Sequence, residues 1–227
     1  MNTPRLVSYS SKDIPLPIKV VCFFAHPDDE TFGPGASLAL WAQRGVEIHV
    51  VCATKGEGGG DGRVRTKELR IAAKLLGVTS VEFLRYNDGK ISNDQLQKLE
   101  KDFLRFIKKY KPDAVLTYDL NGISGHMDHI AIASSTTQAF RKNTIPQALY
   151  YFVSKKYFTD QITEYFIYFP DGKERHEVNL IIDTSSVWEL RVKAMYCHKT
   201  QMKDVENILG RSKNVPKEDW FVVKRRG

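Results

Sequence analysis

Short apolar runs alternate with longer segments of helical period along the first part of the chain, and this alternation constrains the fold more than any other feature. Four runs have the length and composition of buried strands: 20–24, 47–52, 81–84 and 114–118. Four segments favour helices: 36–44, 65–76, 96–107 and 127–141. Strands that alternate with helices are typical of a parallel sheet with helices on its faces. We therefore predict an α/β fold, a Rossmann-like three-layer sandwich with a mostly parallel sheet.

The pattern changes beyond Pro146, where tyrosine, phenylalanine and isoleucine become frequent. Here we expect three further strands and a last helix, at 149–153, 165–169, 178–182 and 187–198 respectively. A chain of 227 residues, of which 42% are hydrophobic, can bury one substantial core. We therefore expect a single domain over residues 19–227, preceded by an N-terminal extension of residues 1–18 that contains a polar run and two prolines.

The formal net charge of +7 is compatible with an anionic substrate, a membrane surface or nucleic acid, because a positive field attracts all three. A solvated surface of lysine and arginine is the simpler explanation. Cys22, Cys52 and Cys197 are far apart, which argues against disulfides and favours a reducing compartment such as the cytoplasm. No segment has the pattern of a signal peptide or a transmembrane span, so we expect at most loose attachment to an anionic membrane.

Polar side chains directly follow two of the predicted strands. One cluster comes after the first strand and consists of His26, Asp28, Asp29 and Glu30. The other comes after the fourth strand and consists of His126, Asp128 and His129. In an open parallel sheet, ligands collect beyond the carboxyl ends of the strands. If these two strands are parallel neighbours, both clusters lie at the same edge of the sheet.

The two clusters contain the donors of a catalytic metal site. His26 and Asp29 are three residues apart, a spacing at which a tight turn can point both side chains at one ion. With one histidine of the second cluster they form the set of two imidazoles and one carboxylate that zinc uses when one position is kept open for water. The spacing leaves open whether that histidine is His126 or His129.

Hydrolysis at such a site needs a base and a hydrogen-bond donor beside the metal. If His26 and Asp29 hold the metal, Asp28 faces elsewhere and does not bind it. Asp28 is therefore the candidate for taking a proton from the attacking water. His126, as an imidazolium, is the candidate for stabilising the oxyanion and protonating the departing amine. Asp128 would hold an imidazole in the required tautomer.

The two clusters resemble the signatures of the LmbE-like, or PIG-L, N-acetylglucosaminyl deacetylases. The first signature, AHPDDE, is complete at residues 25–30. The second, HPDH, stands here as residues 126–129 with Met127 where proline is usual, a change that removes no functional side chain. The resemblance extends from about residue 20 to residue 201 and includes the segments 54–57 and 198–201.

The resemblance implies a deacetylase with one zinc ion per chain, although iron or cobalt can occupy the same ligands. It implies three metal ligands: His26, Asp29 and His129. It also implies Asp28 as general base and His126, supported by Asp128, as the acid that stabilises the oxyanion.

The same resemblance implies four substrate-binding positions: Arg65, Asp88, His198 and Gln201. Arg65 has an alternative explanation, a pair with Asp61 or Glu68 on its own helix, and Asp88 can simply belong to the turn 87–89. The glycine-rich segment Gly56–Gly62 is either a mobile lid or a plain connection.

We therefore predict a zinc-dependent hydrolase that removes an N-acetyl group from a small N-acetylated sugar or glycoconjugate containing N-acetylglucosamine. The alternatives are a metal-dependent phosphoester hydrolase that uses the same carboxylates and a non-catalytic binder of nucleic acid or anionic membrane. We expect no nucleic acid as partner, because the basic residues form no aromatic-interleaved patch. The sequence contains no feature that sets the oligomeric state.

Overall fold

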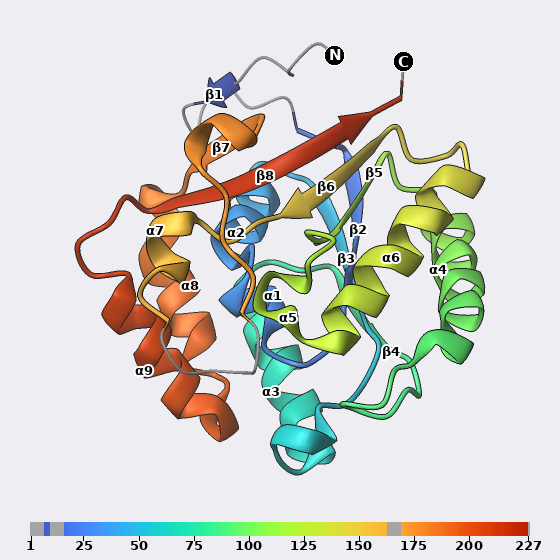
Figure 1. The fold of residues 1–227 in the computed structure, drawn as a ribbon, viewed down its shortest axis with the longest axis horizontal. Coiled ribbons are helices and arrows are strands. Elements are labelled where there is room, and N and C mark those ends of the chain that lie inside the picture. The colour runs from blue at the N-terminus through green and yellow to red at the C-terminus, as the bar shows by residue number, and fades with distance from the viewer. Residues whose placement is uncertain (1–6, 10–15, 163–168, 227) are drawn as a thin grey trace.

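An eight-stranded sheet forms the centre of the computed structural model, which describes residues 7–9, 16–162 and 169–226 (Figure 1). Its strands are β1 Val7–Tyr9, β2 Lys19–Phe24, β3 Glu47–Cys52, β4 Ser80–Phe83, β5 Ala114–Tyr118, β6 Ala148–Phe152, β7 Leu180–Asp183 and β8 Glu218–Arg225. Their order in the sheet is β1-β7-β8-β6-β5-β2-β3-β4. Among these described strands only β8 is antiparallel to its neighbours, β6 and β7. The predicted mostly parallel sheet is confirmed.

Helices cover both faces of this sheet. They are α1 Asp29–Phe32, α2 Gly35–Gln43, α3 Gly62–Leu75, α4 Leu96–Tyr110, α5 Gly122–Gly125, α6 Met127–Lys142, α7 Lys156–Thr159, α8 Trp188–Met195 and α9 Met202–Arg211. α4 and α6 pack together on one side, whereas α2 and α3 pack against α8 on the other (Figure 1). This arrangement confirms the three-layer sandwich. Within the described ranges, every helix is too short or too polar to cross a membrane.

The structure confirms six of the predicted strands to within two residues and corrects the C-terminal third. The strand expected at 165–169 falls almost wholly outside the described residues. Strand β8 was missed because its buried Trp220 and Phe221 stand between charged residues rather than in an apolar run. Helix α9 was also missed, and the helix expected at 187–198 already ends at Met195. Part of the segment predicted as an extension, Val7–Tyr9, pairs with β7.

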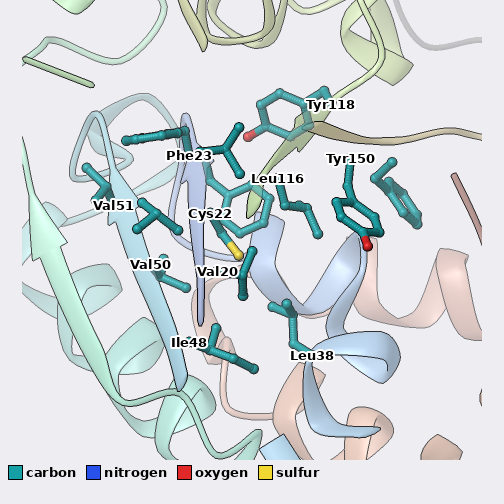
Figure 2. Close-up of a cluster of buried hydrophobic side chains, with 14 of the residues drawn as sticks. Val20, Cys22, Phe23, Leu38, Ile48, Val50, Val51, Leu116, Tyr118 and Tyr150 are labelled. Carbon is teal, nitrogen blue, oxygen red and sulfur yellow. The ribbon is translucent and has the colours of Figure 1, made fainter. Parts of the chain in front are cut away.

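The core lies between the sheet and its two helix layers. Figure 2 shows Cys22 of β2, Ile48 of β3 and Leu116 of β5 packed with Leu38 of α2 and Tyr150 of β6. All five side chains are buried, as expected for parallel strands covered on both faces. This packing holds the carboxyl ends of the central strands in place, and the loops that follow them start from fixed points.

The strand order reverses direction beside β2. β2 pairs with β3 on one side and with β5 on the other, both in parallel register. In open α/β sheets such a switch point creates a crevice at the carboxyl ends of the strands, where ligands bind. The segments after β2 and β5 both start there, so the two predicted clusters do lie at the same edge.

Candidate metal centre and active site

The segment after β2 makes a sharp turn at the edge of a cavity. Asp28 at its centre has a φ of 114°, in a region that non-glycine residues rarely adopt. The backbone N–H of Asp28 donates to Glu30 Oε2 at 3.0 Å, and the Thr31 hydroxyl donates to the Asp28 carbonyl at 2.9 Å. Backbone strain that is held in place by its surroundings clusters at functional sites. Asp28 is the residue that carries this strain.

Donor atoms of the three predicted metal ligands converge around His129 Nε2. His129 Nε2 lies 3.2 Å from His26 Nδ1 and 3.3 Å from Asp29 Oδ1. Donors held tetrahedrally at zinc-ligand distances are about 3.3 Å apart. His126 also offers a ring nitrogen within 4.8 Å of donors on His26 and His129. His26, Asp29 and His129 together supply two imidazoles and one carboxylate, a set that can hold a metal ion with one position open.

The outward-facing ring nitrogens of both histidines have polar partners. His26 Nε2 lies 2.9 Å from Asp88 Oδ1 and 3.1 Å from Asp128 Oδ2. His129 Nδ1 lies 3.1 Å from the Gly122 carbonyl. Partners of this kind fix the orientation of metal-binding imidazoles. The donors of His26, Asp88, His126 and Asp128 also lie within 4.8 Å of one another, and both carboxylates of this group contact His26 Nε2.

Asp128 differs from its predicted place as the support of His126. Its carboxylate contacts the ring of His26 and accepts hydrogen bonds from the backbone N–H groups of Gly89 and Ile91, at 2.8 Å and 3.1 Å. It is the backbone N–H of Asp128, not its carboxylate, that donates to His126 Nδ1, at 3.1 Å. This N-terminal cap of α6 leaves the proton of a neutral His126 ring on Nε2. The geometry therefore sets the His126 tautomer through the backbone.

The electrostatics also change the role expected of His126. Burial, together with the positive charge of His26, lowers the pKa of His126. The imidazolium that the sequence predicted is therefore disfavoured at neutral pH. His126 does line the cavity, and its neutral ring can act there as a hydrogen-bond donor through Nε2–H.

Charge is unevenly distributed over the three converging donors. Burial lowers the pKa of His26, but hydrogen bonds with Asp128 and Asp88 outweigh it and raise that pKa to about 10. Burial lowers the pKa of His129 to about 4. Burial raises the pKa of Asp29, but the charges of His129 and His26 outweigh it and hold that pKa low. The carboxylates gathered here favour a positive charge in their midst, whether a proton or a metal ion.

Tyr118 is a site residue that the sequence analysis missed. Its hydroxyl donates to Asp29 Oδ2 and accepts from the backbone N–H of Ala25 at 2.7 Å. Its ring stacks on His129, with ring centroids 4.2 Å apart and planes 4° from parallel. One side chain thus positions two of the three converging donors. The available signal was its place as the last residue of a predicted strand whose carboxyl end faces the site.

Arg65 braces Asp28 rather than pairing along its own helix. Its Nη2 donates to Asp28 Oδ2 at 2.8 Å and to the Pro27 carbonyl at 2.7 Å, and its Nη1 donates to the Gly56 carbonyl at 2.6 Å. The alternative pairing with Asp61 or Glu68 is therefore wrong. Burial, with the charge of Asp29, raises the pKa of Asp28 to about 8 although Arg65 lowers it. A carboxylate with such a pKa can accept and return a proton near neutral pH.

The glycine-rich segment Gly56–Gly62 packs directly on Arg65. Gly56 has a φ of 74°, and a Cβ at this position would lie 2.5 Å from the guanidinium carbon of Arg65. Gly58 N–H donates to Asp88 at 2.8 Å, and Gln201 Nε2 donates to the Gly59 carbonyl at 3.0 Å. The segment thus forms part of the cavity wall. Asp88, Gln201 and Arg65 line the same cavity, and their contact with a substrate stays a prediction.

His198 does not border the cavity, and this prediction is corrected. Its side chain is fully buried, with Nε2 2.7 Å from Glu30 Oε1, and Glu30 is fully buried too. Through its other oxygen Glu30 accepts the Asp28 backbone N–H. The His198–Glu30 pair therefore lies behind the turn that carries Asp28 and supports it. The sequence analysis had given Glu30 no task.

The family model for PIG-L, described as GlcNAc-PI de-N-acetylase, matches residues 21–140 of this chain. The chain belongs to the PIG-L family. The matched range begins in β2 and ends in α6, so it contains all three converging donors, Asp28 and His126.

Individual PIG-L relatives agree with this. A 1D-myo-inositol 2-acetamido-2-deoxy-alpha-D-glucopyranoside deacetylase of Actinosynnema mirum is 29% identical over 82% of this chain and 81% of its own length. The uncharacterised deacetylase YaiS of Escherichia coli is 35% identical over 58% of this chain and 72% of its own.

Solved structures share the fold. N,N'-diacetylchitobiose deacetylase from Pyrococcus horikoshii superposes with a TM-score of 0.69 at 22% identity, covering 94% of this chain and 85% of that one. The 4-carboxy-2-hydroxymuconate hydratase GalB from Pseudomonas putida superposes with a TM-score of 0.64 at 20% identity, covering 92% and 97%. One fold therefore accompanies different chemistries, and the reaction has to be argued from the site.

Proposed function

We propose that this PIG-L protein is a zinc-dependent deacetylase that hydrolyses the N-acetyl group of an N-acetylglucosamine-containing substrate to an amine and acetate. The observation that carries the proposal is the convergence of His26 Nδ1, Asp29 Oδ1 and His129 Nε2, with 3.2 Å and 3.3 Å from the last atom to the other two. These three side chains would hold the metal, and a zinc ion there would polarise the amide carbonyl and acidify a water molecule.

Asp28 is the group that we assign to proton transfer. It lines the cavity next to Asp29, and its carboxylate is held by Arg65 at 2.8 Å. With a pKa raised to about 8, it can take the proton of the attacking water and then return it to the departing amine. One carboxyl group then serves both halves of the reaction. A neutral His126 is a poor acid, so this assignment gives the acid step to Asp28.

His126 keeps its predicted role of stabilising the oxyanion. The bond from the Asp128 backbone to Nδ1 places the proton of a neutral ring on Nε2, and this ring lines the cavity. A donor placed there stabilises the negative charge that develops on the carbonyl oxygen of the substrate. His126 acts in this proposal as a hydrogen-bond donor and not as a cation.

The sugar part of the substrate is proposed from the relatives. The family description names a GlcNAc-PI de-N-acetylase, and the Actinosynnema mirum relative is named for a 2-acetamido-2-deoxy-glucopyranoside. Both names contain an N-acetylated glucosamine unit with a different group attached to it. We therefore propose the N-acetylglucosamine unit as the common element. Arg65, Asp88 and Gln201 are the cavity residues proposed to contact it.

The test measures acetate and free amine released from a panel of N-acetylglucosaminides, by wild type and by Asp28→Asn. We expect wild type to release both in equal amounts and Asp28→Asn to bind zinc equally well but turn over at least about 100-fold more slowly. Phosphate release from phosphoester substrates without amine formation would instead support a phosphoester hydrolase. A chain that releases neither product, with zinc bound, refutes the proposal.

A further inference from the structure

The cavity that contains the converging donors continues well beyond them. Its volume is about 820 Å³, in the upper part of the range for small-molecule sites. Its far end is lined by the loop after β6, by α8 and α9, and by the loop before β8. These elements lie side by side in Figure 1, at the edge away from α4. A substrate in this cavity has room for a group attached to the sugar.

The two ends of the cavity differ in charge. Around the converging donors the wall carries three carboxylates, Asp28, Asp29 and Asp88, together with the guanidinium of Arg65. The far end, which we call the distal lobe, is lined by the cationic side chains of Lys155, Arg191, Lys203, Arg211 and Lys217 and by the carboxylates of Asp204 and Asp219. A cleft with an excess of one charge focuses the field on its ligand. The distal lobe, with its excess of cationic side chains, therefore favours an anion.

Lys155 is a partly buried cation of the distal lobe. Its Nζ donates to the backbone carbonyl of Glu218. Burial, with the nearby charges of Arg191 and Lys217, lowers the pKa of Lys155 to about 8, although Asp219 acts in the other direction. Asp219 already accepts hydrogen bonds from the backbone N–H and the hydroxyl of Ser37, both at 2.8 Å, and lies 3.7 Å from Arg191.

Arg211 and Lys217 are likewise held by groups that carry no full charge. The Arg211 guanidinium lies 5.8 Å from the ring centroid of Phe158. Lys217 Nζ donates to the carbonyl of Val215 at 3.1 Å and lies 5.0 Å from the ring centroid of Trp188. Within residues 7–9, 16–162 and 169–226, no carboxylate forms an ion pair with Lys155, Arg211 or Lys217. Positive charges that share one pocket repel one another, and an anionic ligand bound among them would relieve this repulsion.

We infer that the distal lobe binds an anionic group, a phosphodiester or a carboxylate, on the part of the substrate attached to the N-acetylglucosamine unit. Lys155, Arg211 and Lys217 supply its positive charge, and the aromatic rings of Phe158 and Trp188 pack beside it. All of these residues lie beyond residues 21–140, the range that the family model matches. The lobe therefore belongs to the part of the chain that lies outside the match to the family model. The inference rests on the proposed deacetylase function.

The experiment compares matched N-acetylglucosaminides whose attached group ends in a phosphodiester, a carboxylate or the neutral methyl ester of that carboxylate. The readout is the ratio of kcat/KM for each anionic substrate to that for the neutral one. We expect the wild-type ratio to be about tenfold or more for at least one anion. Arg211→Gln and Lys155→Met should each lower this ratio by about tenfold, because each removes one hydrogen bond to a charged group. A purely structural defect lowers both rates and leaves the ratio unchanged.

Lys108→Met is the matched control. Lys108 is exposed on α4 and does not line the cavity, so its replacement removes the same charge without touching the lobe. We expect it to keep the wild-type ratio. The anionic substrate whose kcat/KM ratio to the neutral substrate falls in Arg211→Gln identifies the group that the distal lobe binds. A wild-type ratio near one for both anions, or a ratio unchanged in Arg211→Gln and Lys155→Met, overturns the inference.

A binding measurement separates this inference from the proposed function. The same three compounds are titrated by calorimetry into zinc-loaded Asp28→Asn, which turns over slowly, and into the same variant carrying Arg211→Gln as well. Failure of wild type to release amine from any compound refutes the deacetylase, whereas equal affinity of Asp28→Asn for the charged and neutral compounds refutes the distal lobe. Tighter binding of an anion that Arg211→Gln weakens by about tenfold supports the lobe even without turnover.

Discussion

Replacing Tyr118 by phenylalanine removes one oxygen atom that links two parts of the site. The hydroxyl donates to the buried Asp29 carboxylate and accepts from the Ala25 N–H at 2.7 Å, while the ring stacks on His129. A hydrogen bond to a charged group contributes about 1.5–3 kcal/mol, and a buried N–H left unpaired costs about 1–3 kcal/mol. Because the ring and its stacking remain, we expect the free energy of unfolding to fall by about 3 kcal/mol.

The same substitution should weaken metal binding. Asp29 loses the partner that orients it, and loss of such an outer contact typically lowers metal affinity by about 10- to 100-fold. Affinity is measured by competition with a chromophoric chelator, and stability by urea unfolding with chelator present so that the two effects separate.

Tyr151→Phe is the control for Tyr118→Phe. The Tyr151 side chain is as buried as that of Tyr118, but its hydroxyl lies 2.7 Å from the Thr137 hydroxyl and not against a predicted metal ligand. We expect it to cost about 1 kcal/mol of stability and to leave zinc affinity unchanged. If Tyr118→Phe binds zinc within about twofold of wild type, the argument that Tyr118 positions Asp29 is wrong.

Three further predictions follow from the same contacts. Arg65→Lys keeps the positive charge but loses the guanidinium that donates to Asp28 and to two backbone carbonyls. We therefore expect kcat to fall about tenfold or more while zinc is retained, as measured by steady-state kinetics and metal analysis. Glu30→Gln leaves buried His198 without its charged partner and should lower the free energy of unfolding by about 3 kcal/mol, and a urea midpoint equal to wild type would contradict this. Removal of metal by dialysis against a chelator should abolish amine release, and stoichiometric zinc should restore it; full activity in chelator would argue against a metal mechanism.

The strands of the central sheet were predictable because their burial produces continuous apolar runs. Val20, Ile48 and Leu116 belong to strands covered on both faces, and such strands need no alternating pattern to be found. Strand β8 lies between β6 and β7 yet carries Glu218 at one end and Arg225 at the other, which hides its buried centre. Its pairing partners β7 and β6 are 35 to 77 residues away along the chain, beyond any local pattern.

The site was predictable in its components but not in its contacts. The places of His26, Asp29 and His129 follow from polar residues at two strand ends, because parallel neighbours bring those ends together. The contact of Asp128 with His26, and not with its sequence neighbour His126, depends on the rotamer and on backbone donors from the loop after β4. Burial of His198 depends on the packing of α8, which the sequence pattern does not specify.

The central claim is that His26, Asp29 and His129 hold one catalytic metal ion, and metal stoichiometry in ligand variants tests it most directly. Elemental analysis of wild type, His129→Ala and His126→Gln, each purified identically and dialysed against zinc, is compared with the acetate that each releases. We predict one zinc ion per chain in wild type and His126→Gln, little zinc in His129→Ala, and acetate release only at a reduced rate in His126→Gln and not at all in His129→Ala. Zinc bound by His129→Ala as tightly as by wild type would contradict the account.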